Sequence, residues 1–318
     1  MTWVEFELEA PAALHDRVLI DVVASLPGAG FFLRKDNAVA VQVQDPGEEI
    51  RARLRTAGFK ESSSPAGDPV TGPVFGGEHL APVTRRFLSE VSPALLDLLR
   101  ASTANRSDRL AAALDLMAAH LMAVSGALRI DGIPPEVPLG FLSFRSHAEA
   151  FFATSANPGL TRVRMDERFE ANRSAIQDRI LAVFQQLKGE GPEVSAEAGA
   201  WYGAARDTKP VIAEHIRTGG ITADTAYVDD HLRERDDFAD SAFHTAAGSS
   251  TELQRFLRHD PAFLAGRLLT SMLYLSLHGM GVTLVERYFL CHAMSRACEL
   301  IFEVDAMAVL GKIADHGV

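Results

Sequence analysis

The segment GFLSFRSHAEAFF places hydroxyl, guanidinium and imidazole groups close together among four phenylalanines. Ser143, Arg145 and His147 have the chemistry to move protons and to hold a carbonyl or anionic oxygen. Ser146 and Glu149 fit a capping box, in which a serine caps the start of a helix and a glutamate three residues later reaches back. A helix that begins there offers exposed N–H donors to the same oxygen. The alternative is structural: Arg145 pairs with Glu149, and His147 is a hydrogen-bonded core histidine.

A second group of polar residues lies on the helix predicted to begin at Pro261. Arg267, Ser271, Tyr274 and His278 follow one another at steps of four, three and four residues, so they share one helix face. Leucines and methionines cover the other faces, which indicates a buried helix. A polar stripe on a buried helix is either a hydrogen-bonded seam to a neighbouring helix or the polar wall of a cavity.

The next helix repeats this spacing with Tyr288, His292, Ser295 and Glu299, although Ser295 and Glu299 could simply face water. The chain has no complete dinucleotide-binding glycine loop, no phosphate-binding loop and no nucleophile elbow. The segment DDHLRERDD holds residue types that bind metals, but a charge run of this kind is usually a solvated helix face. The sequence therefore predicts neither a cofactor nor a metal.

The elements that position these residues are predicted by two successive sequence patterns, one with strands and helices and one almost wholly helical. TWVEFELEA alternates apolar residues with glutamates, as a half-buried strand does; a helical segment, the strands FFLRK and AVAVQVQ, and a second helical segment follow. Glycine, serine and proline then crowd SSSPAGDPVTGP, and the pattern beyond is almost wholly helical. We expect an α+β fold, with a small βαββα unit over residues 1–75 and a mostly helical region over residues 76–318 that carries the active site.

Composition narrows the class of protein. The 318 residues are 47% hydrophobic and carry a net charge of -11, which argues against a nucleic-acid partner because that role usually needs a basic face. The most apolar stretch contains Arg267 and His278, which favours a buried helix over a membrane span. Cys291 and Cys298 are about 10 Å apart if they share a helix, too far to form a disulfide. Reduced thiols and the lack of a secretory signal predict a cytoplasmic protein.

Five pieces of the chain, in order, support a resemblance to a known family: TWVEFEL, GFFLRKDNAVAVQV, FGGEHLAPVTRRFLSEVSPALLDLL, GFLSFRSHAEAF and the serine-containing helix before Glu286. Together they span most of the sequence. The chain resembles thiopeptide-type bacteriocin biosynthesis proteins, which are relatives of the C-terminal elimination domain of lantibiotic dehydratases. Members that eliminate glutamate usually carry arginines in the second strand of the pair and a histidine followed by Asn-Arg in the C-terminal helix.

This chain departs from that pattern, with AVAVQVQ in the strand and Tyr274, then His278-Gly279, in the helix. In this it is similar to the pyridine synthases of thiopeptide pathways. The resemblance implies a formal [4+2] aza-cycloaddition between two dehydroalanines of a modified precursor peptide, with loss of water and of the leader peptide. It implies no redox cofactor, and it leaves open a homodimer or contacts with other biosynthetic enzymes.

The resemblance also implies roles for the polar residues. Tyr274 is the expected principal donor, because the reaction needs a group that donates to an amide oxygen without being a strong base. The expected catalytic residues are Tyr274, His147, Ser143 and Ser271, and the expected substrate-binding residues are Arg145, Arg267, His278 and Tyr288. Residues 1–75 are the expected docking unit for the leader peptide, by strand addition along Ala38 to Gln44 if that strand is an edge.

Two other functions remain open from the sequence. One is a stand-alone glutamate-eliminating lyase that makes the dehydroalanines, with His147 or His278 as the base. The other is a non-catalytic subunit that binds the precursor peptide and delivers it to partner enzymes.

Overall fold

The computed structural model describes residues 2–26, 28, 30–62, 69–125, 130–219 and 241–316. Its first elements are β1 (Trp3–Glu9), α1 (His15–Asp21), β2 (Gly30–Lys35), β3 (Ala38–Gln44), α2 (Glu48–Thr56) and β4 (Lys60–Glu61). Helices follow: α3 (Gly77–Ala101), α4 (Arg106–Val124), α5 (Phe141–Thr154), α6 (Pro158–Glu170), α7 (Arg173–Lys188), α8 (Ala196–Arg217), α10 (Ala242–Ser249), α11 (Thr251–His259), α12 (Pro261–Gly279), α13 (Leu284–Ile301) and α14 (Ala306–His316). The expected α+β class and βαββα order are confirmed, with β4 as an addition.

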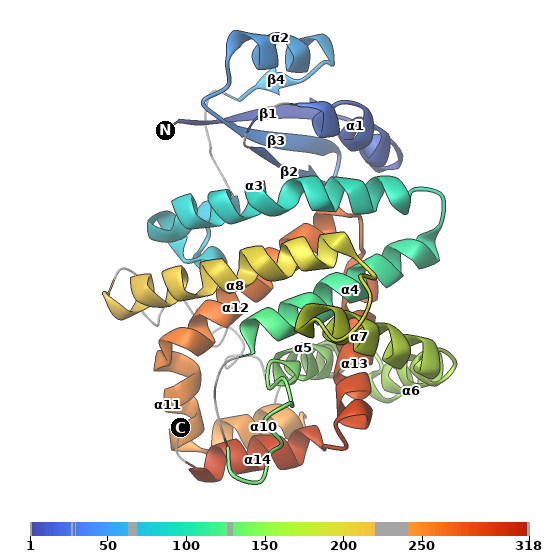
Figure 1. Cartoon of the computed structure of the whole chain (residues 1–318), viewed down its shortest axis with the longest axis vertical. Coiled ribbons are helices and arrows are strands. Elements are labelled where there is room, and N and C mark those ends of the chain that lie inside the picture. Colours follow the sequence, from blue (N-terminus) through green and yellow to red (C-terminus); the bar gives the residue numbers. More distant parts are fainter. Residues whose placement is uncertain are drawn as a thin grey trace.

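The strands form one antiparallel sheet with the order β2-β3-β1-β4 at one end of the molecule (Figure 1). Val41 of β3 lies opposite Phe6 of β1 on one side and Phe32 of β2 on the other. Strand addition along Ala38–Gln44 required an edge strand, and this condition is not met, because both sides of β3 are already hydrogen-bonded. Among the described strands, β2 and β4 are the edges; β2 packs on α3, and β4 has only two residues.

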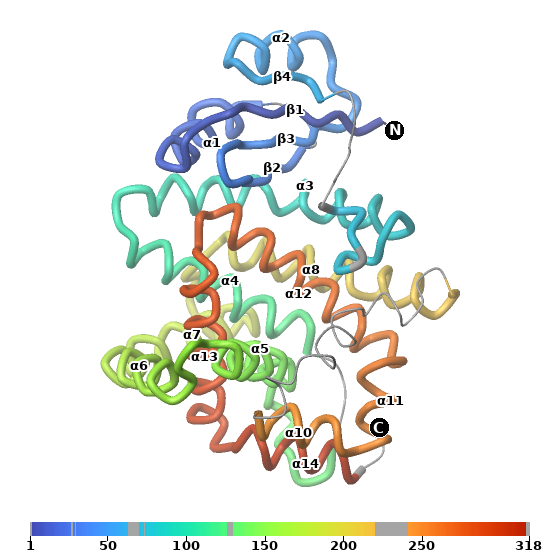
Figure 2. The backbone as a smooth tube through the Cα atoms, turned by 180° about the vertical axis from the view of Figure 1, so that it is seen from behind, coloured from blue at the N-terminus to red at the C-terminus, as the bar shows by residue number. Residues whose placement is uncertain are grey.

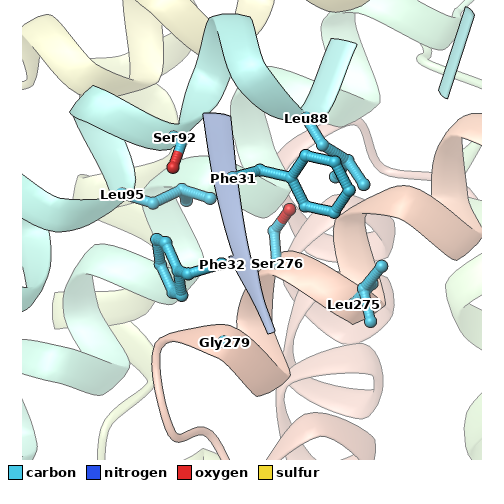
Figure 3. A pocket seen from close by; sticks show the side chains of 8 residues that line it. All are labelled: Phe31, Phe32, Leu88, Ser92, Leu95, Leu275, Ser276 and Gly279. Atoms are coloured by element: carbon cyan, nitrogen blue, oxygen red, sulfur yellow. The ribbon is translucent and has the colours of Figure 1, made fainter. Parts of the chain in front are cut away.

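The sheet joins the helices through β2, which packs against α3 and α12. Figure 3 shows a small hollow at this junction, with room for about one water molecule. Its lining comprises Phe31, Phe32, Leu88, Ser92, Leu95, Leu275, Ser276 and Gly279. Beside it, Asp16 of α1 accepts hydrogen bonds from Arg34 of β2 at 2.5 Å and from Arg109 of α4 at 2.6 Å. These contacts fix the sheet on the helical region.

Gly279→Ala tests this junction. A Cβ atom at Gly279 would lie 3.0 Å from Cε2 of Phe32, so we expect overpacking to lower the free energy of unfolding by about 1–3 kcal/mol. The matched control is Gly203→Ala in α8, where, apart from the helix's own nearby residues, no described atom lies within 4 Å of the new Cβ. That change should stabilise the protein by about 0.5–1 kcal/mol, because alanine restricts the unfolded chain. Urea unfolding of both variants checks the result, and equal effects would contradict it.

Three helices carry the polar residues picked out in the sequence. α13 packs along α5, and α12 packs against α8 and α4 (Figure 2). Asp260 caps α12 by accepting a hydrogen bond from the Phe263 backbone at 2.7 Å, and Gly281, with a φ of 77°, follows its end. The start of α12 at Pro261 agrees with the sequence prediction.

The start of α5 differs from the prediction. The helix begins at Phe141, after Gly140, and no side chain caps it. Ser146 and Glu149 are thus helix-interior residues, and the predicted capping box is wrong. The turn beginning at Pro138 starts the helix earlier, because its carbonyl accepts a hydrogen bond from the Phe141 backbone at 3.0 Å. In the part of the chain that the structure describes, no helix has the length and apolar character needed to cross a membrane.

Candidate active site

Tyr274 of α12 lies where α5 and α13 meet. Its hydroxyl is 3.0 Å from Nδ1 of His147 on α5 and 3.3 Å from Sγ of Cys291 on α13. The rings of Tyr274 and His147 are nearly perpendicular, with centroids 5.1 Å apart. We call these three residues, together with Arg287 and Tyr288, the tyrosine cluster. Its members come from three helices, so only their packing creates it.

Arg287 brings a positive charge to the tyrosine cluster. Its guanidinium carbon lies 4.6 Å from the centre of the Tyr274 ring and 5.1 Å from that of Tyr288. Nε of Arg287 is buried and has no hydrogen-bond partner among the described residues. Tyr288 in turn stacks on Phe151 of α5, with ring centres 4.6 Å apart. A cation held by aromatic faces keeps N–H donors available for a substrate oxygen.

The pKa shifts of the tyrosine cluster favour neutral groups. Burial lowers the pKa of His147 to about 4, and the charges of Arg287 and Arg267 act in the same direction. Burial raises the pKa of Tyr274 well above its usual value of 10.0 and raises the pKa of Cys291 to about 11. At neutral pH the cluster therefore offers a tyrosine hydroxyl, a neutral imidazole and a protonated thiol. Such a set exchanges protons without leaving a buried charge on these three residues.

Three other predicted residues lie on turns next to the tyrosine cluster. Ser143 is one turn before His147 on α5, and its backbone carbonyl contacts the His147 ring. Ser271 is partly buried on α12 and its hydroxyl donates to the backbone carbonyl of Arg267 at 3.4 Å. The Arg267 guanidinium lies 6.0 Å from the Phe263 ring centre. Their predicted roles in catalysis and binding stay predictions.

Arg145 and His278 are held by other contacts. Arg145 lies 2.8 Å from the Glu149 carboxylate, as the structural alternative expected, and also 3.6 Å from that of Glu299. His278 is exposed near the end of α12, beside Arg34 of β2. Among the described residues, no hydrogen bond joins either side chain to Tyr274 or His147. Substrate binding by these two residues stays a prediction.

The second stripe, on α13, is buried more deeply than the sequence suggested. Glu299 and Ser295 do not face water: they are 6% and 0% exposed. Glu299 accepts hydrogen bonds from Arg296 and from the Ala306 backbone. His292 is also buried, with Nε2 2.9 Å from an Asp166 oxygen. This part of the stripe is a polar contact between α13, α5 and α6.

Several members of the site are absent from the sequence prediction. Arg287 lies near the N-terminus of α13, where a positive charge opposes the helix dipole. This unfavourable position is the signal by which the sequence could have identified Arg287 as a site residue. The sequence holds no signal for Cys291 as a site residue, and the spacing of Ser146 and Glu149 predicts a helix cap instead. His244 of α10 was missed altogether; its Nε2 is 3.1 Å from the Ser146 hydroxyl. No local pattern predicts these contacts, because their partners are distant in the sequence.

The described residues contain no group of three histidine, cysteine or acidic side chains arranged to hold a metal ion. The DDHLRERDD segment lies outside them. The geometry therefore places a tyrosine hydroxyl, an imidazole, a thiol and a guanidinium together between three helices of an α+β fold.

The family model described as lantibiotic biosynthesis dehydratase C-term matches residues 73–298, and the chain belongs to this family. The fold is also that of two solved structures. The crystal structure of TsrL is 23% identical and covers 98% of each chain with a TM-score of 0.78. The structure of TbtD, a pyridine synthase from thiomuracin biosynthesis, is 18% identical and covers 95% of this chain and 99% of its own, with a TM-score of 0.64. No curated protein matches the sequence.

Proposed function

We propose that the chain is a thiopeptide pyridine synthase. Its reaction is the formal [4+2] aza-cycloaddition between two dehydroalanines of a modified precursor peptide, followed by loss of water and of the leader peptide. The observation that carries the proposal is the hydrogen bond between Tyr274 and His147 beneath the Arg287 cation, in a chain with the fold of TbtD. The departures from the glutamate-eliminating sequence pattern support it.

The neutral Tyr274 and His147 pair suits the first step. One dehydroalanine must convert its amide to the hydroxy-imine tautomer, so the nitrogen loses a proton and the oxygen gains one. In the proposed transfer the amide nitrogen gives its proton to Nε2 of His147, Nδ1–H of His147 gives one to the Tyr274 oxygen, and the Tyr274 O–H protonates the amide oxygen. Each side chain returns to neutrality in one concerted exchange, which avoids forming a buried ion.

Positioning supplies much of the remaining catalysis. Two distant residues of a flexible peptide must meet in one geometry, and holding them there can lower the barrier by about 7–11 kcal/mol. The flat faces of Tyr288 and Phe151 provide an apolar surface beside the Tyr274 hydroxyl. Arg287 is placed to hold a carbonyl oxygen of the bound peptide.

The test of the proposal is incubation of the purified chain with a precursor that carries both dehydroalanines, followed by mass measurement and thiol labelling. Ring formation removes two thiol-reactive alkenes and releases the leader peptide. A glutamate-eliminating lyase would leave this precursor unchanged but would remove glutamate from a glutamylated precursor. A carrier subunit would bind both peptides and change neither, and either of these results would contradict the proposal.

The Arg287→Gln variant is a second test of the proposed function, because it measures what the Arg287 charge contributes to turnover. The change removes the cation but keeps hydrogen-bonding capacity, so we expect turnover to fall by about 10- to 100-fold, as for loss of a charged hydrogen bond. The control is Arg206→Gln on α8, where an exposed guanidinium lies 5.7 Å from the Tyr202 ring centre. That variant should retain normal turnover. A fully active Arg287→Gln enzyme would remove Arg287 from the mechanism.

A further inference from the structure

A second hydrogen-bonded chain lies next to the tyrosine cluster. Nε2 of His244 is 3.1 Å from the Ser146 hydroxyl, and Nδ1 of His244 is 2.8 Å from the Ser241 hydroxyl. Ser146 directly precedes His147 on α5, and α10, which carries His244, packs against α5. His244 is close enough to His147 to lower its pKa. Two hydroxyl–histidine pairs, Tyr274 with His147 and Ser146 with His244, thus lie next to each other.

The geometry makes His244 a base for Ser146. A neutral imidazole has one N–H donor and one acceptor nitrogen. With the proton on Nδ1, His244 donates to Ser241 and its Nε2 accepts the O–H of Ser146. Ser241 is buried and also caps α10 through the backbone N–H of His244, so its hydroxyl is fixed in place. Ser146 is only partly buried, so we assign the ligand to this end of the chain.

The tyrosine cluster alone is poorly suited to the later steps. After the ring has closed, a ring carbon must lose a proton while the leader amide leaves. His147 binds a proton weakly, because it is buried and faces Arg287 and Arg267. The neutral Tyr274 hydroxyl is a donor. A separate acceptor is therefore needed, and His244 of α10 provides one through Ser146, which precedes His147 on α5.

We propose that Ser146, His244 and Ser241 form the proton-transfer chain for release of the leader peptide. His244 accepts the ring proton through Ser146: the C–H bond breaks and its electron pair forms a ring double bond. The bond from the ring to the leader nitrogen breaks, and that nitrogen keeps the electron pair and takes the proton back. The leader leaves as a neutral carboxamide, and nothing is oxidised or reduced. This inference rests on the proposed pyridine synthase function.

The experiment is a single-turnover reaction of the full chain with the dehydroalanine-containing precursor. Thiol labelling measures ring formation and mass measurement follows release of the leader. For His244→Gln we expect near-normal ring formation and release slower by about 100-fold, as for loss of a general base. The cyclised peptide with its leader attached should accumulate. Ser146→Ala should show the same intermediate with a smaller defect, because water can replace one hydroxyl.

His259→Gln is the control, since His259 is exposed at the end of α11. Thermal melting shows that each variant is folded. Normal leader release by folded His244→Gln, or equal slowing of ring formation and release, would overturn the inference while leaving the proposed function intact. Absence of any ring with the unmodified chain would overturn both.

Discussion

Tyr274→Phe is expected to lower the rate of ring formation by about 100- to 1000-fold, as for loss of one preorganised donor. The change deletes a single oxygen and keeps the flat ring that Arg287 covers. Peptide affinity should therefore change little. His147 and Cys291 lose a hydrogen-bond partner, which should cost about 0.5–1.5 kcal/mol of stability. Single-turnover kinetics and urea unfolding separate the two effects.

Tyr202→Phe in α8 is the matched control for this variant. Tyr202 is also partly buried and lies beside an arginine, Arg206, but it is on a helix outside the tyrosine cluster. It should keep normal turnover. If Tyr274→Phe loses stability but retains full turnover, Tyr274 is only part of a hydrogen-bonded seam between α12, α5 and α13.

Glu149→Ala is expected to lower the free energy of unfolding by about 1.5–3 kcal/mol, because it removes a buried carboxylate that accepts charged hydrogen bonds from Arg162 and leaves Arg145 with only the more distant Glu299. Glu149 is 5% exposed and accepts hydrogen bonds from Arg162 at 3.0 and 2.5 Å. Arg145 also lies 2.8 Å from the same carboxylate. Glu214→Ala is the control, since Glu214 forms an exposed pair with Arg217; its loss should cost under about 1 kcal/mol. Equal losses would contradict the predicted difference.

The same carboxylate should make stability depend on pH. Burial acts to raise the pKa of Glu149, but hydrogen bonds and charges from Arg162 and Arg145 outweigh it, and the pKa falls below the usual 4.5. A lowered folded-state pKa stabilises the protein above pH 4.5, and the contribution is lost as the pH falls through the folded value. Urea unfolding across this acidic range should show a steeper loss for the unmodified chain than for Glu149→Gln. Parallel curves would contradict the assignment.

The fold class could be read from the sequence because its signals are local. Alternation in β1 and helical spacing in α12 depend on residues at most a few positions apart, and the two segments form the predicted strand and helix. Asp260 at the start of α12 is a cap of the same local kind. The strand order could not be read in this way. The central position of β3 depends on pairing with β1 and β2, and on the cover that α3 gives to β2.

The candidate site likewise has one part that local spacing predicts and another part that only the tertiary structure determines. Helical spacing determined that Tyr274 shares a polar face with Ser271 and Arg267, and the tyrosine was identified from that stripe. The tertiary structure alone decided its partners. His147 is 127 positions away in the sequence, and the bond from Ser146 to His244 spans 98. Such contacts depend on how α5, α10, α12 and α13 pack, because side chains from separate helices meet only where their buried faces fit together.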